Sequence, residues 1–434
     1  MSKLYGLVDC NNFFVSCERV FRPDLERKPV VVLSNNDGCI VSRSNEAKEM
    51  GIPMGLPFFK IGDYDPLRRV TAFSSNYALY ADLSRRVMLV ITEAGLDLTP
   101  YSIDESFVSF GGEDDSFREI VKSLPELVMK CTGIPVSVGL ASSKTLAKLA
   151  CRFAKKYKGY NGFCEISSEA ARLKALSLIE IGDVWGIGRR RVEGLRKAGI
   201  KTARDFTMMS EQQVRHVMGI TGLRTWRELH GVDSISVDNS ESKKSICTSR
   251  SFADMVTSYE QLSAHVADFA SMSSVKLRQQ HSAANIVSVY IGTNVFRSDL
   301  GTYCNTESVV LPMAASSQME IVNAALFALK RIFNPQVAYK KAAVIVSGIV
   351  SDNAIQQPLF GNDPERRSRM EKLSVVIDDI NKNKGRDKVH LGIQRVGKMS
   401  QADVDGVTLA NLRREYKSPA YTTDWNEILK VVAK

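Results

Sequence analysis

Apolar and polar positions in the N-terminal third of the chain alternate with two different periods. Residues 4–8 predict a buried strand that ends at Asp9, and residues 13–21 predict a helix with one apolar face. Two apolar runs, 29–34 and 39–42, flank an Asn-Asn-Asp-Gly turn and predict a hairpin. Helices are also expected at 43–50, 76–94, 117–131 and 142–157, and a strand at 135–141. This order favours an α/β or α+β first domain.

The stretch 101–107 carries two adjacent carboxylates, Asp104 and Glu105. Apolar and hydroxyl residues alternate on both sides of this pair, which predicts two short strands that meet at a tight corner. Adjacent carboxylates repel each other, and they suit a site that holds a divalent cation. The alternatives are a solvated acidic turn here and, for Asp9, a simple helix cap.

The helix predicted at 142–157 carries a row of basic side chains. Lys144, Lys148, Arg152 and Lys155 recur three and four residues apart, so they line one helical face. The row begins in the same predicted domain as the carboxylates. A basic face that is exposed to solvent is the alternative.

From about residue 178 the sequence pattern changes to short helices joined by a Gly-x-Gly segment. Short helices are predicted at 178–184 and 189–198, and the glycines between them allow a backbone to approach a phosphate closely. The segment resembles a helix-hairpin-helix, which binds DNA backbone without reading sequence, and a plain helical turn is the alternative. Its glycines and arginines are Gly186, Gly188, Arg189, Arg190 and Arg191.

The second half of the chain is organised differently. Residues 232–242 are polar and lack apolar periodicity, which predicts a linker. Strands are then expected at 245–252, 285–293, 303–311 and 341–349, and helices at 259–280 and 318–333. Strand–helix–strand–strand–helix–strand is the split βαβ order, a compact sheet with helices on one face. The region after 351 is more polar, with a charged helix near 364–381.

Composition narrows the classes of partner and compartment. A chain of 434 residues has room for about two to four domains. Its net charge of +10 favours an acidic partner such as nucleic acid, although a merely basic soluble protein is the alternative. The eight cysteines include no CxxC pair, which argues against zinc and disulfides and fits a reducing cytosol. No apolar run approaches about 18 residues, so we expect a cytoplasmic protein without a membrane span.

The order of these features resembles the Y-family DNA polymerases. Asp9 after the first strand, Phe13-Phe14 behind it and Ser102-Ile103-Asp104-Glu105 on a hairpin carry the resemblance. Further segments resemble the UmuC branch, which contains the catalytic subunit of bacterial DNA polymerase V. These segments are 34–39, 73–77, 144–148 and 184–190. The similarity runs in order along nearly the whole chain and includes the C-terminal extension.

The resemblance implies an α+β, multidomain fold. A ferredoxin-like polymerase palm would cover 1–173, with small fingers inserted at about 12–78, and a helix-hairpin-helix thumb would cover 174–231. A split βαβ little finger would span 243–350, and the extension 351–434 would carry a clamp-binding motif. The implied activity is error-prone translesion synthesis of the SOS-mutagenesis type. In this reaction, deoxynucleotides are added to a DNA primer opposite damaged template.

The resemblance also implies a catalytic site with two Mg²⁺ ions. Positioning and charge neutralisation dominate phosphoryl transfer. The ions would activate the primer 3′ oxygen and stabilise the leaving pyrophosphate. Asp9 and Asp104 match the bridging carboxylates, and Glu105 matches the ligand of the primer-side ion. The carbonyl of Cys10 matches a further ligand of the nucleotide-side ion.

Substrate contacts are implied in the same way. Phe14 matches the steric gate that meets a ribose 2′-hydroxyl, and Lys48 and Lys155 match cations that bind the triphosphate. Asn45 stands where many family members carry a tyrosine, so that contact is not carried over. The implied nucleotide contacts are Phe13, Phe14, Ser42, Arg43, Lys48 and Lys155. The implied DNA contacts are Lys144, Lys148, Gly186, Gly188, Arg189 and Arg190.

The pentapeptide 356–360 resembles a bacterial clamp-binding segment. Gln356, Leu359 and Phe360 would bind the replication sliding clamp, unless the two apolar residues fold back onto the little finger. The expected partners are primer–template DNA, deoxynucleoside triphosphates, the clamp, a UmuD-like accessory subunit and a recombinase filament, with no membrane. Two rival functions are a catalytically silent DNA-binding or scaffold protein and a metal nuclease. The intact carboxylates argue against the first, and Phe14 with the fingers against the second.

Overall fold

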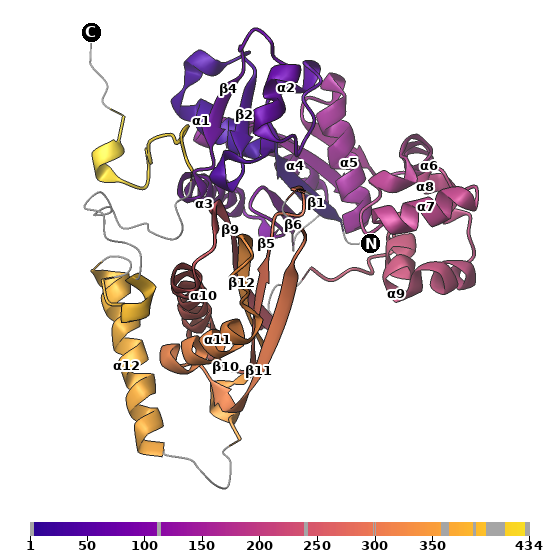
Figure 1. Cartoon of the computed structure of the whole chain (residues 1–434). Helices are drawn as coiled ribbons and strands as arrows, with labels where there is room; N and C mark the ends of the chain where they lie inside the picture. The colour runs from indigo at the N-terminus through magenta and orange to yellow at the C-terminus, as the bar shows by residue number, and fades with distance from the viewer. Residues whose placement is uncertain are drawn as a thin grey trace. The chain divides into compact units, whose positions relative to one another are not determined.

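The computed structural model describes residues 4–110, 114–237, 242–297, 299, 301–356, 364–384, 388–395 and 413–429. The chain divides into two units, Met1–Asn239 with Arg414–Lys434, and Ser240–Arg413 (Figure 1). This division falls inside the segment 232–242 that the sequence predicts as a linker. All eight cysteines are free. No helix among the described residues is both long and apolar enough to cross a bilayer.

A five-stranded sheet forms the centre of the first unit, in the order β5-β6-β1-β7-β8. The strands are β1 (Tyr5–Cys10), β5 (Asp97–Pro100), β6 (Glu105–Ser109), β7 (Val136–Ala141) and β8 (Phe163–Ile166). β1 pairs antiparallel with both β6 and β7, whereas β7 and β8 are parallel. The sequence predicts β1, β7 and the β5–β6 corner. It misses β8, a strand of four residues that has no hairpin turn beside it to mark it.

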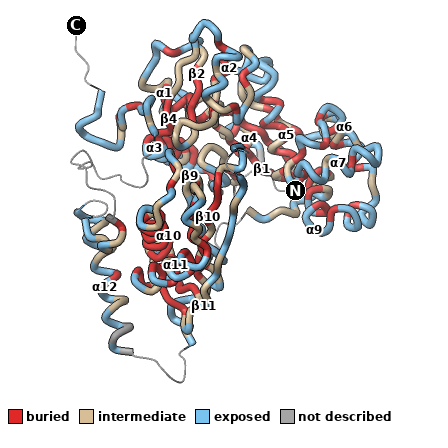
Figure 2. The backbone as a smooth tube through the Cα atoms, in the orientation of Figure 1, coloured by how far each residue is buried: buried red, intermediate tan, exposed pale blue. Residues whose placement is uncertain are grey.

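Hydrophobic cores lie on both faces of this sheet, and its middle strand β1 is largely buried (Figure 2). Val8 and Val108 belong to a core with α1 (Phe13–Phe21), α3 (Tyr77–Glu93) and α4 (Asp114–Thr132). Leu7 and Phe107 belong to the other core, with α5 (Lys144–Lys156). Successive strand residues point to opposite faces. The sheet is therefore covered on both sides.

A smaller sheet in the same unit has the order β3-β2-β4, made of β2 (Val30–Leu33), β3 (Ile40–Arg43) and β4 (Thr71–Ser74). The antiparallel pairing of β2 with β3 confirms the predicted hairpin. Its turn contains Asn36 with a φ of 60°, a left-handed conformation that asparagine tolerates better than most residues. The predicted helix near 43–50 is α2 (Asn45–Glu49). β4, which the sequence does not predict, runs parallel to β2 and forms an edge of the sheet.

Four helices complete the N-terminal part of this unit: α6 (Glu169–Leu178), α7 (Arg189–Lys197), α8 (Ala203–Thr207) and α9 (Glu211–Leu229). The helix predicted at 178–184 is wrong. α6 ends at Leu178 because Glu180 pairs with Thr202 in an extended bridge, and only a 3₁₀ turn follows. These helices share one hydrophobic core with α5 and Leu7. The palm–thumb boundary implied after residue 173 therefore falls inside α6 and between residues of one core.

The second unit has the split βαβ order that the sequence predicts. Its elements are β9 (Ser245–Val256), α10 (Tyr259–Gln279), β10 (Ser282–Gly292), β11 (Cys304–Ala315), α11 (Gln318–Ile332) and β12 (Tyr339–Ser351). The antiparallel sheet has the order β11-β10-β12-β9, and α10 and α11 share its core (Figure 2). The predicted charged helix is α12 (Pro364–Asn383). Asp378 of α12 accepts two hydrogen bonds from Arg278 of α10, at 2.7 and 2.8 Å.

The contact between β7 and α5 is unusually close. A Cβ atom on Gly139 of β7 would lie 2.1 Å from the carbonyl oxygen of Ala147 and 2.2 Å from the amide nitrogen of Cys151. We expect Gly139→Ala to force α5 away from the sheet and to lower the free energy of unfolding by about 1–3 kcal/mol or more. Denaturant unfolding measures this loss. Gly159→Ala, where nothing lies within 4 Å, is the matched control, and equal stability of the two variants would contradict the prediction.

Candidate active site

Two strand ends bring the three carboxylates to one edge of the central sheet. β1 and β6 are antiparallel, so Asp9 near the end of β1 lies opposite Glu105 at the start of β6. The amide of Cys10 donates a hydrogen bond to the carbonyl of Asp104 at 2.9 Å. Ser102 fixes the corner, since its hydroxyl oxygen accepts from the amides of Asp104 and Glu105 at 3.2 and 3.0 Å. The predicted corner is confirmed.

The chain leaves the acidic edge through a strained residue. Asn12, with a φ of 48°, stands at the N-terminus of α1, so Asp9 does not cap this helix and that alternative is wrong. The side-chain oxygen of Asn12 accepts from Lys48 Nζ at 2.6 Å, and its amide nitrogen donates to Asn45 at 3.1 Å. The turn after β1 therefore connects the acidic edge to α2.

The basic row of α5 is paired with acidic side chains and is not a simple solvated face. Lys155 forms an ion pair with Asp9, and Lys148 lies 3.1 Å from Glu105. The remaining pairs, each at 2.6 Å, are Lys144–Asp233 and Arg152–Asp183. α5 can reach the carboxylates because Gly139 lets it lie against β7.

Burial dominates the electrostatics of Asp9. Desolvation raises the pKa of this carboxyl to about 6, and the neighbouring Glu105 and Asp104 add to the rise, while Lys155 opposes it. Burial lowers the pKa of Lys155, but the ion pair and hydrogen bond with Asp9, together with the nearby Cys151 and Glu105, raise it above its ordinary value. Concentrated negative charge and a cation are thus held together in a poorly solvated place.

The donor atoms suit a hard divalent cation. Carboxylate and carbonyl oxygens are the ligands that Mg²⁺ prefers. Within the described part of the chain, no group of three His, Cys, Asp or Glu side chains is disposed to hold a metal ion. In this arrangement the ammonium groups of Lys148 and Lys155 lie on two of the carboxylates instead. The residues fit a metal by chemistry, and a bound ion would take over the charge compensation that the lysines supply.

Two adjacent aromatic residues differ in their surroundings. The ring of Phe14 stacks on Tyr80, with centroids 4.6 Å apart, and meets the ring of Tyr77 edge-on at 6.0 Å. Phe13 is 3 % exposed and belongs to the hydrophobic core. Because its side chain is buried, Phe13 could contact a nucleotide only through its backbone.

Three cations from separate elements influence one another near the acidic edge. Burial lowers the pKa of Lys48, and the positive charges of Arg43 and Lys155 lower it further. One guanidinium nitrogen of Arg43 donates to the carbonyl of Ile52. Ser42 is buried, and its hydroxyl donates to the carbonyl of Asn12 at 3.4 Å. The predicted triphosphate cations Lys48 and Lys155 are therefore brought into one electrostatic environment.

Trp185 is a site residue that the sequence treats only as part of a glycine motif. Its indole nitrogen donates to the hydroxyl of Tyr101 at 3.0 Å, and Lys148 Nζ lies 4.3 Å from the Tyr101 ring centre and 5.2 Å from that of Trp185. A cavity of about 370 Å³ joins these elements. Its lining includes Asp9, Glu105, Lys148, Arg152, Lys155, Asp183 and Trp185. No local sequence signal links residue 185 to residue 101.

The predicted DNA contacts are spread over several elements and are not part of this cavity, apart from Lys148. Gly186 has a φ of 88°, and a Cβ atom there would lie 2.6 Å from the hydroxyl of Thr225. Gly188 caps α7, and Arg189 and Arg190 are exposed on its first turn. Lys144 points to Asp233.

Of the proposed clamp segment 356–360, the structure describes only the first residue. Gln356 is exposed, whereas Leu359 and Phe360 lie outside the described residues.

Comparisons with known proteins agree with this architecture. A model of the impB/mucB/samB family matches residues 8–152, the C-terminal domain of that family matches 243–359, and a domain of unknown function matches 371–431. The chain is 37% identical over 432 residues to the protein UmuC of Salmonella typhimurium, covering 99% of this chain and 100% of that protein. It is 26% identical to a DNA polymerase IV of Dehalococcoides mccartyi, covering 89% of this chain and 96% of that one.

A solved structure has the same fold. It is a chimera of the Y-family DNA polymerases Dbh and Dpo4, and it matches with a TM-score of 0.65 at 18% identity. The match covers 80% of this chain and 99% of the chimera.

Proposed function

Because the chain belongs to the UmuC branch of the Y-family, a family of DNA-directed DNA polymerases, we propose that it extends DNA primers opposite damaged template bases in SOS mutagenesis. The observation that carries this proposal is the acidic edge formed by Asp9, Asp104 and Glu105 beside the cations of α5. A silent scaffold has no need of three converging charges.

Two Mg²⁺ ions would be held by the carboxylates of Asp9, Asp104 and Glu105 and by the carbonyl of Cys10. When bound, the ions would supply Lewis-acid activation of the primer 3′ oxygen and charge stabilisation of the leaving pyrophosphate. The protein's own residues position the substrates and balance charge, which is the larger share of phosphoryl-transfer catalysis. In the structure, Lys155 forms an ion pair with Asp9. When a nucleotide is bound, the ammonium group of Lys155 would pair with the negative charge of the triphosphate instead.

The remaining nucleotide contacts follow from the same site. Lys48 and Arg43 would bind phosphate oxygens, with Ser42 supporting the hairpin that carries them. Phe14 would face the deoxyribose as the sugar gate, backed by Tyr80. The exposed Arg189 and Arg190 on α7, with Gly186 and Gly188, would bind the duplex backbone without reading bases.

Further partners are proposed from the resemblance. Gln356, Leu359 and Phe360 would tether the polymerase to the sliding clamp, which raises its local concentration on DNA without changing the chemistry. A UmuD-like accessory subunit and a recombinase filament complete the proposed assembly, which would act in the cytoplasm. Primer extension across an abasic template, with and without these partners, tests the activity.

The first test removes one metal ligand. We expect Asp104→Asn to lower kcat for single-nucleotide insertion by more than the roughly 10- to 100-fold loss typical of residues that only support a ligand. DNA affinity should stay at the parental level, because the basic surfaces are unchanged. Asp115→Asn, an exposed carboxylate, is the control. Undiminished extension by Asp104→Asn would sink the catalytic assignment.

The second test addresses sugar selection. Phe14→Ala replaces the ring with a methyl group and opens space for one oxygen atom. We expect the ratio of kcat/KM for ribonucleotides to that for deoxynucleotides to rise by roughly 10- to 100-fold. An unchanged ratio would place the gate at another residue.

The third test addresses the duplex backbone. Replacing Arg189 and Arg190 by alanine should weaken DNA binding equally for all sequences. The slope of log affinity against log salt should fall by up to about one unit per lost phosphate contact. Replacing Arg85 and Arg86, which pair with Asp82, removes the same charge and is the control. A loss confined to particular sequences would contradict backbone binding.

A further inference from the structure

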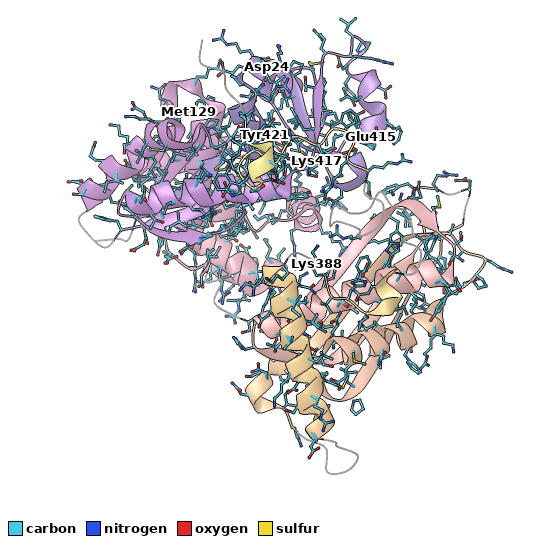
Figure 3. The ribbon with its side chains drawn as sticks, turned by 90° about the vertical axis from the view of Figure 1, so that its left-hand side faces the viewer. Asp24, Met129, Lys388, Glu415, Lys417 and Tyr421 are labelled. Carbon is cyan, nitrogen blue, oxygen red and sulfur yellow. The ribbon has the colours of Figure 1, made fainter. Side chains whose placement is uncertain are left out.

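The C-terminal segment 414–429, here called the strap, adds to the free edge of β4. The amide of Ser74 donates to the carbonyl of Tyr416 and the amide of Tyr416 donates to the hydroxyl of Ser74, both at 3.0 Å. Ser74 and Lys417 form a parallel bridge. Figure 3 shows Glu415, Lys417 and Tyr421 along this segment where it lies on the N-terminal part of its unit. The strap thus covers an edge that would otherwise expose unpaired backbone groups.

Two side chains anchor the strap. Tyr421 is 6 % exposed and stacks on Phe21 of α1, with ring centroids 4.3 Å apart and an interplanar angle of 8°. Asn76, the N-cap of α3, donates from its side-chain nitrogen to the hydroxyl of Ser418 and to the carbonyl of Pro419, both at 3.1 Å. The strap therefore fastens the first turn of α3 and the end of α1.

A chain of contacts leads from the strap to Phe14. The hydroxyl of Ser418 donates to Glu18 Oε1 at 3.0 Å, and the hydroxyl of Tyr80 donates to the same oxygen at 2.6 Å. Glu18 is completely buried, and burial raises its pKa although both hydrogen bonds oppose the rise. A buried carboxylate that depends on two donors holds both of them in place. Tyr80 in turn is the stacking partner of Phe14.

We propose that the strap is a positioning element for sugar selection, which acts through Ser418, Glu18 and Tyr80 on the ring of Phe14. The inference deepens the proposed function and rests on the role of Phe14 given there. It assigns a task to a segment that lies in a domain of unknown function. Without the strap, Glu18 loses one of its two donors, Tyr80 is less constrained, and the Phe14 ring can yield to a 2′-hydroxyl.

The docking of the strap is tested in the full chain by hydrogen exchange, which needs no enzymatic activity. Tyr421→Ala removes the stacked anchor and should raise the exchange rates of amides in β4 and the first turn of α3 by roughly tenfold or more. Trp425→Ala is the matched control, because this aromatic residue of the strap is 89 % exposed. Unchanged exchange rates in Tyr421→Ala would overturn the proposal that the strap holds β4 and the first turn of α3 in place.

The effect on the sugar gate is tested by the ratio of kcat/KM for ribonucleotides to that for deoxynucleotides. Ser418→Ala should raise this ratio by roughly threefold to tenfold, because one charge-assisted hydrogen bond is lost. Thr423→Ala is the control, since its hydroxyl donates only within the strap, to the carbonyl of Ala420. In a Phe14→Ala background, Ser418→Ala should change the ratio no further.

The outcomes separate the two proposals. If Phe14→Ala raises the ratio and Ser418→Ala does not, the positioning role is overturned while Phe14 remains the gate. If Ser418→Ala acts equally with and without the Phe14 ring, the route through Phe14 is overturned. If Phe14→Ala leaves the ratio unchanged, the gate assignment of the proposed function fails, and with it the link from the strap to sugar selection.

Discussion

The antiparallel pairing of β1 with β6 is the constraint on which the site depends. It sets Asp9 opposite Glu105 and next to Asp104 in a poorly solvated place, where like charges repel strongly. Such an arrangement persists only if cations compensate it. α5 supplies them through Lys148 and Lys155, and it can do so because it lies directly on β7.

The same cations link the stability of the fold to the proposed chemistry. The side chain of Lys155 is 36 % exposed and that of Asp9 is 14 % exposed, so their ion pair is partly solvated and contributes little to the stability of the fold. The ion pair is better explained by the proposed function, in which a metal ion would replace Lys155 beside Asp9 and a phosphate would bind the released Lys155. The rings of Trp185 and Tyr101 both lie near the ammonium group of Lys148. The hydrogen bond between Trp185 and Tyr101 joins the glycine-rich segment to the acidic edge.

The aromatic side of the site depends on an interaction between the two ends of the chain. Glu18 near the start and Ser418 near the end share a hydrogen bond across 400 positions of sequence. Tyr80, bound to the same carboxylate, then supports Phe14. The proposed sugar gate has to discriminate one oxygen atom and therefore needs a rigid support, which a buried network of hydrogen bonds provides.

The sequence by itself determined the features that local patterns encode. The hairpin of β2 and β3, the acidic corner and the split βαβ order follow from periods of two and 3.6 residues and from turn chemistry. β4 and β8 were missed because they are short strands that pair with distant strands and have no hairpin turn beside them. The helix expected at 178–184 was wrong, because Glu180 pairs with Thr202 in an extended bridge. Candidate ligands such as Asp9 were identified from strand ends and family resemblance.

Only the tertiary structure decided which partners these residues have. Lys148 reaches Glu105 across 43 positions, and Trp185 reaches Tyr101 across 84, through contacts that no local period encodes. The pairing of a basic row with particular carboxylates follows from how closely α5 packs on the sheet. The docking of the strap depends on the free edge of β4, which is far from the strap in sequence. These are outcomes of packing, because hydrogen bonds and ion pairs form between whatever the fold brings together.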